Sequence, residues 1–306
     1  MIPSRWGAGK LVCGDAAVVR RAGYVASFAI LTIWAAVCLV PPLWLVTLSL
    51  QQPIDIASGP FFLPFIDFRP SADGWRSLFN DAGLYAMRPL ATSLVLTTAS
   101  ALATVALAAP AAYVLSGLPA RRQRGLLLWL LAPRLLPPAV LAGGMYLMAQ
   151  EAGLLDTRTA LTLADLALNL PVAVWVLRDS FAAIPAELRD AAVIDGASQF
   201  TLFRRIALPL ARPGLAVALL VVAALAWGEY PIANMLTIDR AQVLPSILVG
   251  MIAVREQAAV YEPRNAEIAA LVLAMAVPPM AAALALRRPL ARCLPGSMGA
   301  GTRGDD

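Results

Sequence analysis

Four side chains in otherwise apolar stretches of this sequence are the best suited to chemistry. Glu229 lies two residues after Trp227, and Asp165 and Asn169 are four residues apart in a second apolar stretch. Carboxylates, an amide and an indole can hold a polyhydroxylated solute by hydrogen bonds and stacking, and ionisable groups in apolar segments are functional candidates by default. We therefore take Trp227, Glu229, Asn169 and Asp165 as candidates for lining a solute pathway.

Each of these candidates also has a purely structural interpretation. Pro231 cannot donate a backbone hydrogen bond to the preceding turn and Gly228 weakens the same turn, so we expect the helix to break there. Broken helices expose polar backbone, which is tolerated only against protein or a water-filled cavity. Alternatively, Glu229 lies near the outer surface and pairs with another loop or a partner chain. Asp165 and Asn169 face the same way, so hydrogen bonding inside the bundle is their alternative role.

Most enzyme chemistry is excluded by residue types that the sequence lacks. It has no histidine, which removes Ser-His-Asp triads, His-zinc sites and haem on a proximal His. Cys13, Cys38 and Cys293 are too far apart in sequence to indicate a disulfide framework or a thiolate metal site. A P-loop needs a lysine followed by Ser or Thr, whereas Lys10 is followed by Leu11. We therefore expect no catalytic residue, no metal and no resident cofactor, and an energy source outside the chain.

The elements that must position the four candidates are membrane helices. The 306 residues are 60% hydrophobic and only 14% charged, whereas soluble domains are about 45–50% apolar and about 25% charged. We therefore predict an all-α membrane protein. Six windows are long and apolar enough to span a bilayer, or nearly so: 29–50, 89–120, 125–150, 160–177, 213–238 and 268–286.

Two windows are less regular than the others. Arg134 interrupts the window 125–150, and we expect the helix to begin late there so that the arginine reaches the membrane surface along its aliphatic stem. The window 160–177 contains two polar residues and is the weakest, so the fallback is five spans with a re-entrant fourth. The first apolar run is too long for the h-region of a signal peptide and no small-x-small cleavage pattern follows, which favours a retained signal-anchor.

The distribution of basic residues predicts the orientation. Sixteen of the 24 basic residues fall in the N-terminal segment, the C-terminal tail and the loops on the same side, against seven in the opposite loops. Cytoplasmic loops carry the excess of arginine and lysine, so both termini are predicted to be cytoplasmic. The longest loop has about 40 residues, which is too short for a catalytic domain.

The cytoplasmic loop between the fourth and fifth windows carries the most specific pattern. Pro185 suits the first turn of a helix and Glu187 lies near the positive end of its dipole. Ala192 and Gly196 are four residues apart on one predicted face, where a partner backbone could approach closely. We predict a helix-turn-helix whose second helix is ended by Pro209. On composition alone, the alternative is an amphipathic connector resting on the bilayer surface.

The order of residues in this loop favours a different interpretation. The pattern D-A-A-x-x-D-G-A, followed by I-x-L-P, resembles the EAA motif of binding-protein-dependent ABC permeases, with an Asp in place of the usual Glu. The positions that this resemblance assigns to coupling with an ATPase are Glu187, Asp190, Ala191, Ala192, Asp195, Gly196, Ala197, Ile206, Leu208 and Pro209.

Further segments are similar to the smaller permease of maltose-type systems. They are Pro42-Leu43-Trp44, the stretch 110–115 with Ala111-Ala112-Tyr113, Gly153-Leu154-Leu155-Asp156-Thr157, Leu170-Pro171-Val172-Ala173-Val174-Trp175, and the ending from Arg287 to Gly296. The segment Trp227-Gly228-Glu229-Tyr230 also matches, although Gly228 replaces the usual Asn. The resemblance covers nearly the whole chain after residue 25.

The resemblance implies the type I ABC importer permease fold, with six transmembrane helices and both termini cytoplasmic. Its divisions would be an N-terminal segment 1–25, a first span and extracytoplasmic loop 26–89, a core 90–287 with a coupling loop 179–212, and a tail 288–306. It implies the inner membrane of a bacterium or archaeon, a lipid-embedded heterodimer with a second permease, two ATPases that bind ATP and Mg, an extracytoplasmic binding protein and no nucleic acid.

The solute stays open at this point. A sugar or related solute fits the resemblance, and an organic phosphate or another polar metabolite is the alternative within the same machinery. The resemblance also implies that the other permease could hold most of the solute. An ion-coupled secondary transporter or a membrane enzyme is a third class, but such transporters often have paired broken helices in two repeated halves, and only one clear break is present here.

Overall fold

The computed structural model describes residues 11–59, 62–79, 84–257 and 265–286, and the regular elements within them are helices. The first 10 residues, the tail 288–306 and the family-like ending from Arg287 to Gly296 lie outside the described residues. The helices are α1 (Leu11–Ser49), α2 (Pro53–Ser58), α3 (Asp73–Phe79), α4 (Leu84–Ser116), α5 (Ala120–Leu131), α6 (Pro138–Glu151), α7 (Arg158–Ala182), α8 (Ala186–Ile194), α9 (Gln199–Leu202), α10 (Leu208–Leu210), α11 (Arg212–Trp227), α12 (Pro231–Leu236), α13 (Leu244–Gln257) and α14 (Asn265–Ala285).

Four helices in the described part are long and apolar enough to cross a membrane unaided. They lie in α1, α4, α7 and α14, and two strongly bent helix pairs raise the number of candidate spans to as many as six. The first pair joins α5 to α6 at 87°, and the second joins the segment 199–210 to α11 at 75°. The prediction of an all-helical membrane protein is confirmed for the described residues, whereas the count of six and the orientation stay predictions.

The weakest predicted window is in fact the most deeply embedded helix. α7 is continuous over 25 residues and half of its apolar window is buried inside the protein, so the re-entrant fourth span is wrong. Its polar residues face other helices rather than water, which is why local hydropathy underrates it. The third window, 125–150, is strongly bent instead. A 3₁₀ turn (Ala132–Leu135) and Pro133, Pro137 and Pro138 interrupt its α-helical hydrogen bonds.

α13 is an element that the window search misses. Its apolar part, Leu244–Ala253, has 10 residues, about half of what a spanning helix needs. Its first turn is fixed from a distance, because the Leu244 backbone N–H donates to the Ser93 hydroxyl on α4 at 2.9 Å.

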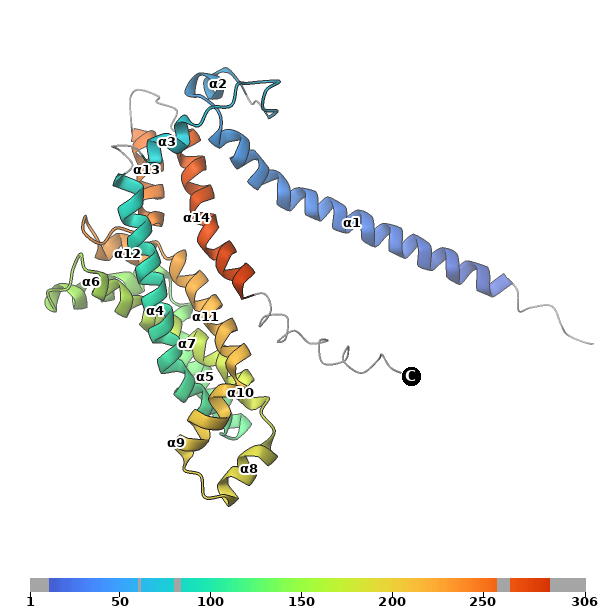
Figure 1. Ribbon diagram of the computed structural model, residues 1–306, viewed down its shortest axis with the longest axis vertical. Coiled ribbons are helices and arrows are strands. Elements are labelled where there is room, and N and C mark those ends of the chain that lie inside the picture. Colours follow the sequence, from blue (N-terminus) through green and yellow to red (C-terminus); the bar gives the residue numbers. More distant parts are fainter. Residues whose placement is uncertain (1–10, 60–61, 80–83, 258–264, 287–306) are drawn as a thin grey trace, which may run out of the picture.

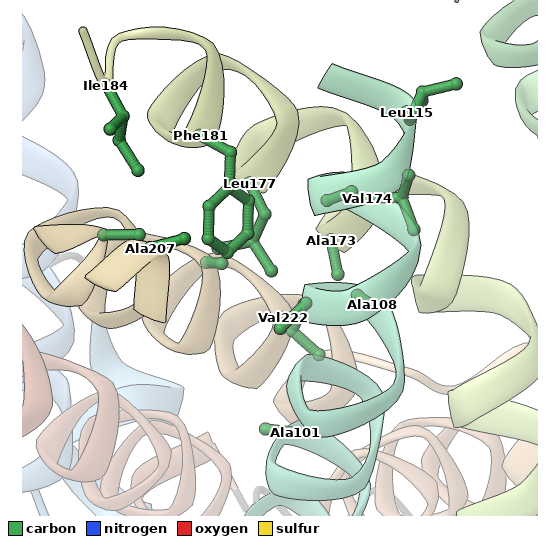
Figure 2. Close-up of a cluster of buried hydrophobic side chains, with 14 residues drawn as sticks. Ala101, Ala108, Leu115, Ala173, Val174, Leu177, Phe181, Ile184, Ala207 and Val222 are labelled. Carbon is green, nitrogen blue, oxygen red and sulfur yellow. The ribbon is translucent and has the colours of Figure 1, made fainter. Parts of the chain in front are cut away.

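The core is built from α4, α7 and α11, which pack through small side chains. Ala108 and Ala112 on α4, Ala173 on α7 and Ala218 on α11 are fully buried, and Leu177 fills the space beside them. Figure 2 shows Leu177 and Phe181 of α7 lying between α4 and the segment that carries Ala207 and Val222. Small residues let membrane helices approach closely, as these three do.

The ends of the molecule differ in how they are built. α8 and α9 form the lower end in Figure 1, whereas α2 and α3 lie at the opposite end. α1 diverges from the bundle along most of its length, contacts α14, and has none of its apolar window buried. Its exposed apolar surface suits lipid or another membrane chain.

A close contact between α7 and α11 generates the first prediction. A Cβ added at Gly214 of α11 would lie 2.0 Å from Oγ and 2.4 Å from Cβ of Ser180 on α7, so rotation of the hydroxyl alone cannot relieve the clash. We expect Gly214→Ala to lower the stability by about 1–3 kcal/mol, the usual cost of overpacking. The measurement is thermal unfolding of the detergent-purified protein.

Gly144→Ala on α6 is the matched control, because a Cβ at Gly144 meets nothing within 4 Å. Alanine also has the higher helix propensity, so this variant is expected to unfold at the same or a higher temperature. Equal unfolding temperatures for the two variants would contradict a tight contact between α7 and α11.

Candidate coupling loop and membrane-embedded polar cluster

The predicted helix-turn-helix is present in the loop 179–212, and Gly196 makes its turn. α8 begins after Pro185 and ends in a Schellman motif, in which Ala197 N–H donates to the Ala192 carbonyl at 2.9 Å and Gly196 N–H to the Val193 carbonyl at 3.0 Å. Gly196 has a φ of +77°, the left-handed region that favours glycine.

The predicted reason for Gly196 is therefore corrected. It does not share a helix face with Ala192, because it lies beyond the end of α8 and Ala192 is buried within this chain. A Cβ at Gly196 would meet nothing within 4 Å, so the glycine is needed here for its backbone conformation and not for close packing inside the chain.

The second half of the loop also departs from the prediction. The Ser198 side chain accepts from Thr201 N–H and caps α9, and a π-helical turn (Phe203–Ala207) follows. Pro209 does not end this segment, since the chain stays helical to Leu210 and bends by 75° before α11. Proline interrupts a helix partly because it has no N–H to donate to the carbonyl four residues earlier. The preceding π turn has already changed which carbonyl each N–H pairs with, so less is lost at Pro209.

The base of the loop is fixed to the helix core by aromatic contacts. The ring centroid of Phe203 lies 5.2 Å from that of Tyr113 on α4 and 6.2 Å from that of Phe181 on α7. Ile184 and Ala207 are buried in the same apolar cluster, near Phe181 in Figure 2. The base of the loop therefore packs directly against α4 and α7.

The tip of the loop is exposed and mixes acidic with apolar side chains. Ile194 is 85% exposed and Phe200 is 69% exposed, and Leu188 and Val193 are also exposed. Among the positions assigned by resemblance, Glu187, Asp190, Ala191, Asp195, Gly196 and Pro209 are exposed, Ala197, Ile206 and Leu208 are half-buried, and Ala192 is buried. An apolar patch rimmed by carboxylates is typical of a protein interaction surface.

Asp165 and Asn169 are buried on α7, and the exposed Arg134 reaches Asn169 from the break between α5 and α6. Both α7 side chains are 3% exposed. The Arg134 guanidinium donates to the Asn169 Oδ1 at 2.9 Å and to the Leu168 carbonyl at 2.8 Å. The break between α5 and α6 lets the exposed Arg134 contact α7, and the late start of the helix at Pro138 agrees with the prediction, whereas the position of Arg134 relative to the membrane surface stays a prediction.

The predicted break after Trp227 is confirmed. α11 ends at Trp227, α12 begins at Pro231, and the Glu229 carboxylate accepts from the Ile232 N–H at 3.0 Å. Glu229 is half-buried and lies close enough to Asp165 for their carboxyl groups to repel each other. The Asp165 Oδ2 is buried without a hydrogen-bond partner in the described part of the chain.

Trp227 itself is directed away from this cluster. Its indole N–H donates to the Met275 carbonyl on α14 at 3.0 Å, and the ring is 9% exposed. Among the described residues, no group of three His, Cys, Asp or Glu side chains is arranged to hold a metal ion. We therefore define the polar cluster by its hydrogen-bonding side chains: Asp165, Glu229, Asn169 and Arg134.

Sequence reasoning noted Asp156 only as part of a motif, yet it fixes a distant loop. Its carboxylate accepts hydrogen bonds of 3.0–3.2 Å from four successive backbone N–H groups at 238–241. Its own N–H donates to the Leu236 carbonyl at 2.9 Å. Burial alone would raise the pKa of Asp156, but the four donors outweigh it and hold the pKa below its ordinary value.

Gln123 is a second residue that local pattern does not reveal. It is 5% exposed, and its Nε2 donates to the Leu115 carbonyl at the end of α4 at 2.9 Å. Its Oε1 accepts from the Arg178 Nε at 3.1 Å, so α4, α5 and α7 are tied together near the loop 179–212. A glutamine in an arginine-rich stretch looks like an ordinary surface residue, and only the packing shows its role.

Comparison with known proteins agrees with this architecture. The family described as binding-protein-dependent transport system inner membrane component matches residues 105–277. Because that is more than half of the chain, the protein belongs to this family, a class of inner-membrane transport permeases.

Individual relatives extend the match. The chain is 32% identical over 216 residues to the probable ABC transporter permease protein y4oR of Sinorhizobium fredii, covering 71% of this chain and 76% of that protein. It is 28% identical over 214 residues to the trehalose/maltose transport system permease protein MalG of Thermococcus litoralis, covering 69% and 75%. A bacterial ABC transporter involved in the import of the acidic polysaccharide alginate superposes with a TM-score of 0.68 at 18% identity, covering 94% of this chain and 99% of that one, which shows a shared fold.

The Asp156 network generates the second prediction. We expect Asp156→Asn to lower the stability by about 1–3 kcal/mol, because the amide cannot accept from all four donors and its NH₂ group faces N–H groups. Asparagine tolerates the φ of +56° at this position, so backbone strain does not confuse the result. Thermal unfolding in detergent measures the change.

The pH dependence has a definite sign. A carboxyl group with a lowered pKa stabilises the folded protein above its unfolded-state pKa, and this contribution is lost as the pH falls through the folded-state pKa. The stability difference between wild type and Asp156→Asn should therefore disappear in acid. Asp239→Asn, which changes an exposed carboxylate in the same loop, is the control and should behave as wild type. An advantage that persists unchanged in acid would contradict this role.

Proposed function

We propose that this protein is one permease subunit of an ATP-driven ABC importer for a sugar or related solute, and that the loop 179–212 couples it to an ATPase. The observation that carries the proposal is the contrast within this loop. Its tip, α8 and the turn at Gly196, is exposed and both acidic and apolar, while its base is buried against α4 and α7. A partner docked on the tip would move the core directly.

The partners follow from the same architecture. Two ATPases would dock on the cytoplasmic side, one per permease, and would bind the ATP and Mg. The exposed apolar surface of α1 supports a second permease as a partner in the membrane. This subunit itself would have six transmembrane spans, with both termini in the cytoplasm. The family description supports an extracytoplasmic binding protein that delivers the solute.

Within the core 90–287, the pathway would pass the polar cluster. The unpartnered Asp165 Oδ2 and the half-buried Glu229 supply acceptors for solute hydroxyl groups, whereas Asn169 is engaged by Arg134. Trp227, with its indole held on α14, would support the broken helix from behind rather than stack on the solute. The name of the Thermococcus relative supports a sugar, and a non-sugar polar solute is the alternative.

The coupling proposal makes the third prediction. Gly196→Asp should leave the protein folded and inserted but uncouple ATP hydrolysis from uptake. The chain has room for the new side chain, and aspartate is among the non-glycine residues best tolerated at positive φ, so the strain that it adds to the turn should leave the protein folded while the new charge lies on the surface offered to the partner. Uptake and ATP hydrolysis are measured together in vesicles holding the complete transporter.

The control for added charge is Ser198→Asp, two residues away. Aspartate is an equally good N-cap, so the start of α9 is preserved and uptake should stay within about twofold of wild type. Normal uptake by Gly196→Asp, or ATP-independent uptake by wild type, would overturn the coupling role. A panel of labelled neutral, acidic and phosphorylated sugars in the same vesicles identifies the solute class.

A further inference from the structure

A cavity away from the polar cluster has a composition that the proposed pathway does not explain. It has a volume of about 630 Å³ and lies between the start of α4, the start of α7 and the loop after α12. The residues of its wall that matter here are Arg88, Thr92, Arg158, Asp239, Arg240 and Gln242. Its volume is within the range of about 300–1,000 Å³ that small-molecule sites occupy.

The charge of this wall is strongly positive. Three arginines face one carboxylate, that of Asp239, and no salt bridge engages Arg88, Arg158 or Arg240 in the described part of the chain. Arg158 is also the first residue of α7, so the positive end of the helix dipole adds to the field.

The cavity wall is also held in place by hydrogen bonds within the protein. The Arg158 Nη2 donates to the Thr92 hydroxyl at 3.3 Å, which directs the side chain across the gap between α7 and α4. The backbone of Arg240 is fixed by the Asp156 carboxylate at 3.0 Å. Because the Asp156 carboxylate is engaged by backbone N–H groups, it is not used to neutralise the guanidinium groups.

We propose that this cavity binds the anionic group of an acidic sugar, as a carboxylate, sulfate or phosphate, on its way to the pathway. The planar guanidinium fork matches such groups with two parallel hydrogen bonds, and a neutral sugar would not need three unpaired arginines. The inference rests on the proposed transport function and narrows it to an acidic solute.

The test is binding to the full chain alone, without ATP or partners, in phosphatidylcholine nanodiscs. Calorimetric titration with glucuronate should show binding that weakens with salt, and glucose should bind at least tenfold more weakly. The triple variant Arg88→Gln, Arg158→Gln and Arg240→Gln should lose at least tenfold in glucuronate affinity. Asp239→Asn removes the opposing charge and should strengthen glucuronate binding.

Arg69→Gln is the matched control, because it removes one exposed arginine outside the cavity. Thermal unfolding of each variant establishes that it is folded. Equal affinity for glucose and glucuronate, or an equal loss in Arg69→Gln, would overturn the proposal. Suppression of glucuronate binding by phosphatidylglycerol nanodiscs would assign the cavity to a lipid headgroup instead.

Vesicle uptake separates this inference from the proposed function. If the complete transporter imports neutral sugars and the triple variant does so normally, the acidic-solute inference fails while the transport function stands. If the triple variant loses capture of the binding protein with every solute alike, the cavity is a docking surface and the inference also fails. ATP-driven uptake of acidic sugars that is lost only in the triple variant supports it.

Discussion

The structure depends on one packing constraint, the close approach of α4, α7 and α11. Fully buried alanines line the contact, and Gly214 approaches Ser180 so closely that a single methyl group would clash. Lipid chains are as apolar as leucine, so no hydrophobic gain drives these helices together, and van der Waals contact must supply the cohesion. Small side chains are the means of obtaining that contact, and they also make the core stiff.

Most polar groups of the bundle are satisfied within the protein, and the exceptions among the described residues are one buried oxygen each on Thr97, Thr104, Ser246 and Asp165. Arg134 turns through a helix break to reach Asn169, and Glu229 accepts from a backbone N–H freed by another break. The same breaks that cost helical hydrogen bonds thus place the side chains that replace them. Asp165 differs, since one of its oxygens is buried and unpartnered beside Glu229, a costly arrangement unless another ligand completes it.

What the sequence could predict was local. Proline and glycine predicted the break after Trp227, and residue order predicted the helix-turn-helix of the loop, because both depend on neighbours in the chain. The fit of Arg134 on α7 and of Asp156 on a loop 82 residues away depends on tertiary contacts, which no local pattern encodes. Gly196 was predicted to matter because of its small size, whereas the structure shows that the turn needs its positive φ.

The continuous α7 explains how events at the two ends of the molecule could be linked. Phe181 contacts Phe203 of the coupling loop, and Asp165 lies 16 residues earlier on the same helix, roughly 24 Å away by helical rise. Neighbouring elements are interrupted at residues 132–138, 211 and 228–230, whereas α7 stays helical from Arg158 to Ala182 although it contains Pro171. Under the proposed coupling, a displacement of the loop would reach Asp165 along α7, together with Arg134, which is hydrogen-bonded to α7, whereas Glu229 lies beyond the break after Trp227. The position of Asp165 relative to Glu229 would then change with the state of the loop, as a solute site that opens and closes requires.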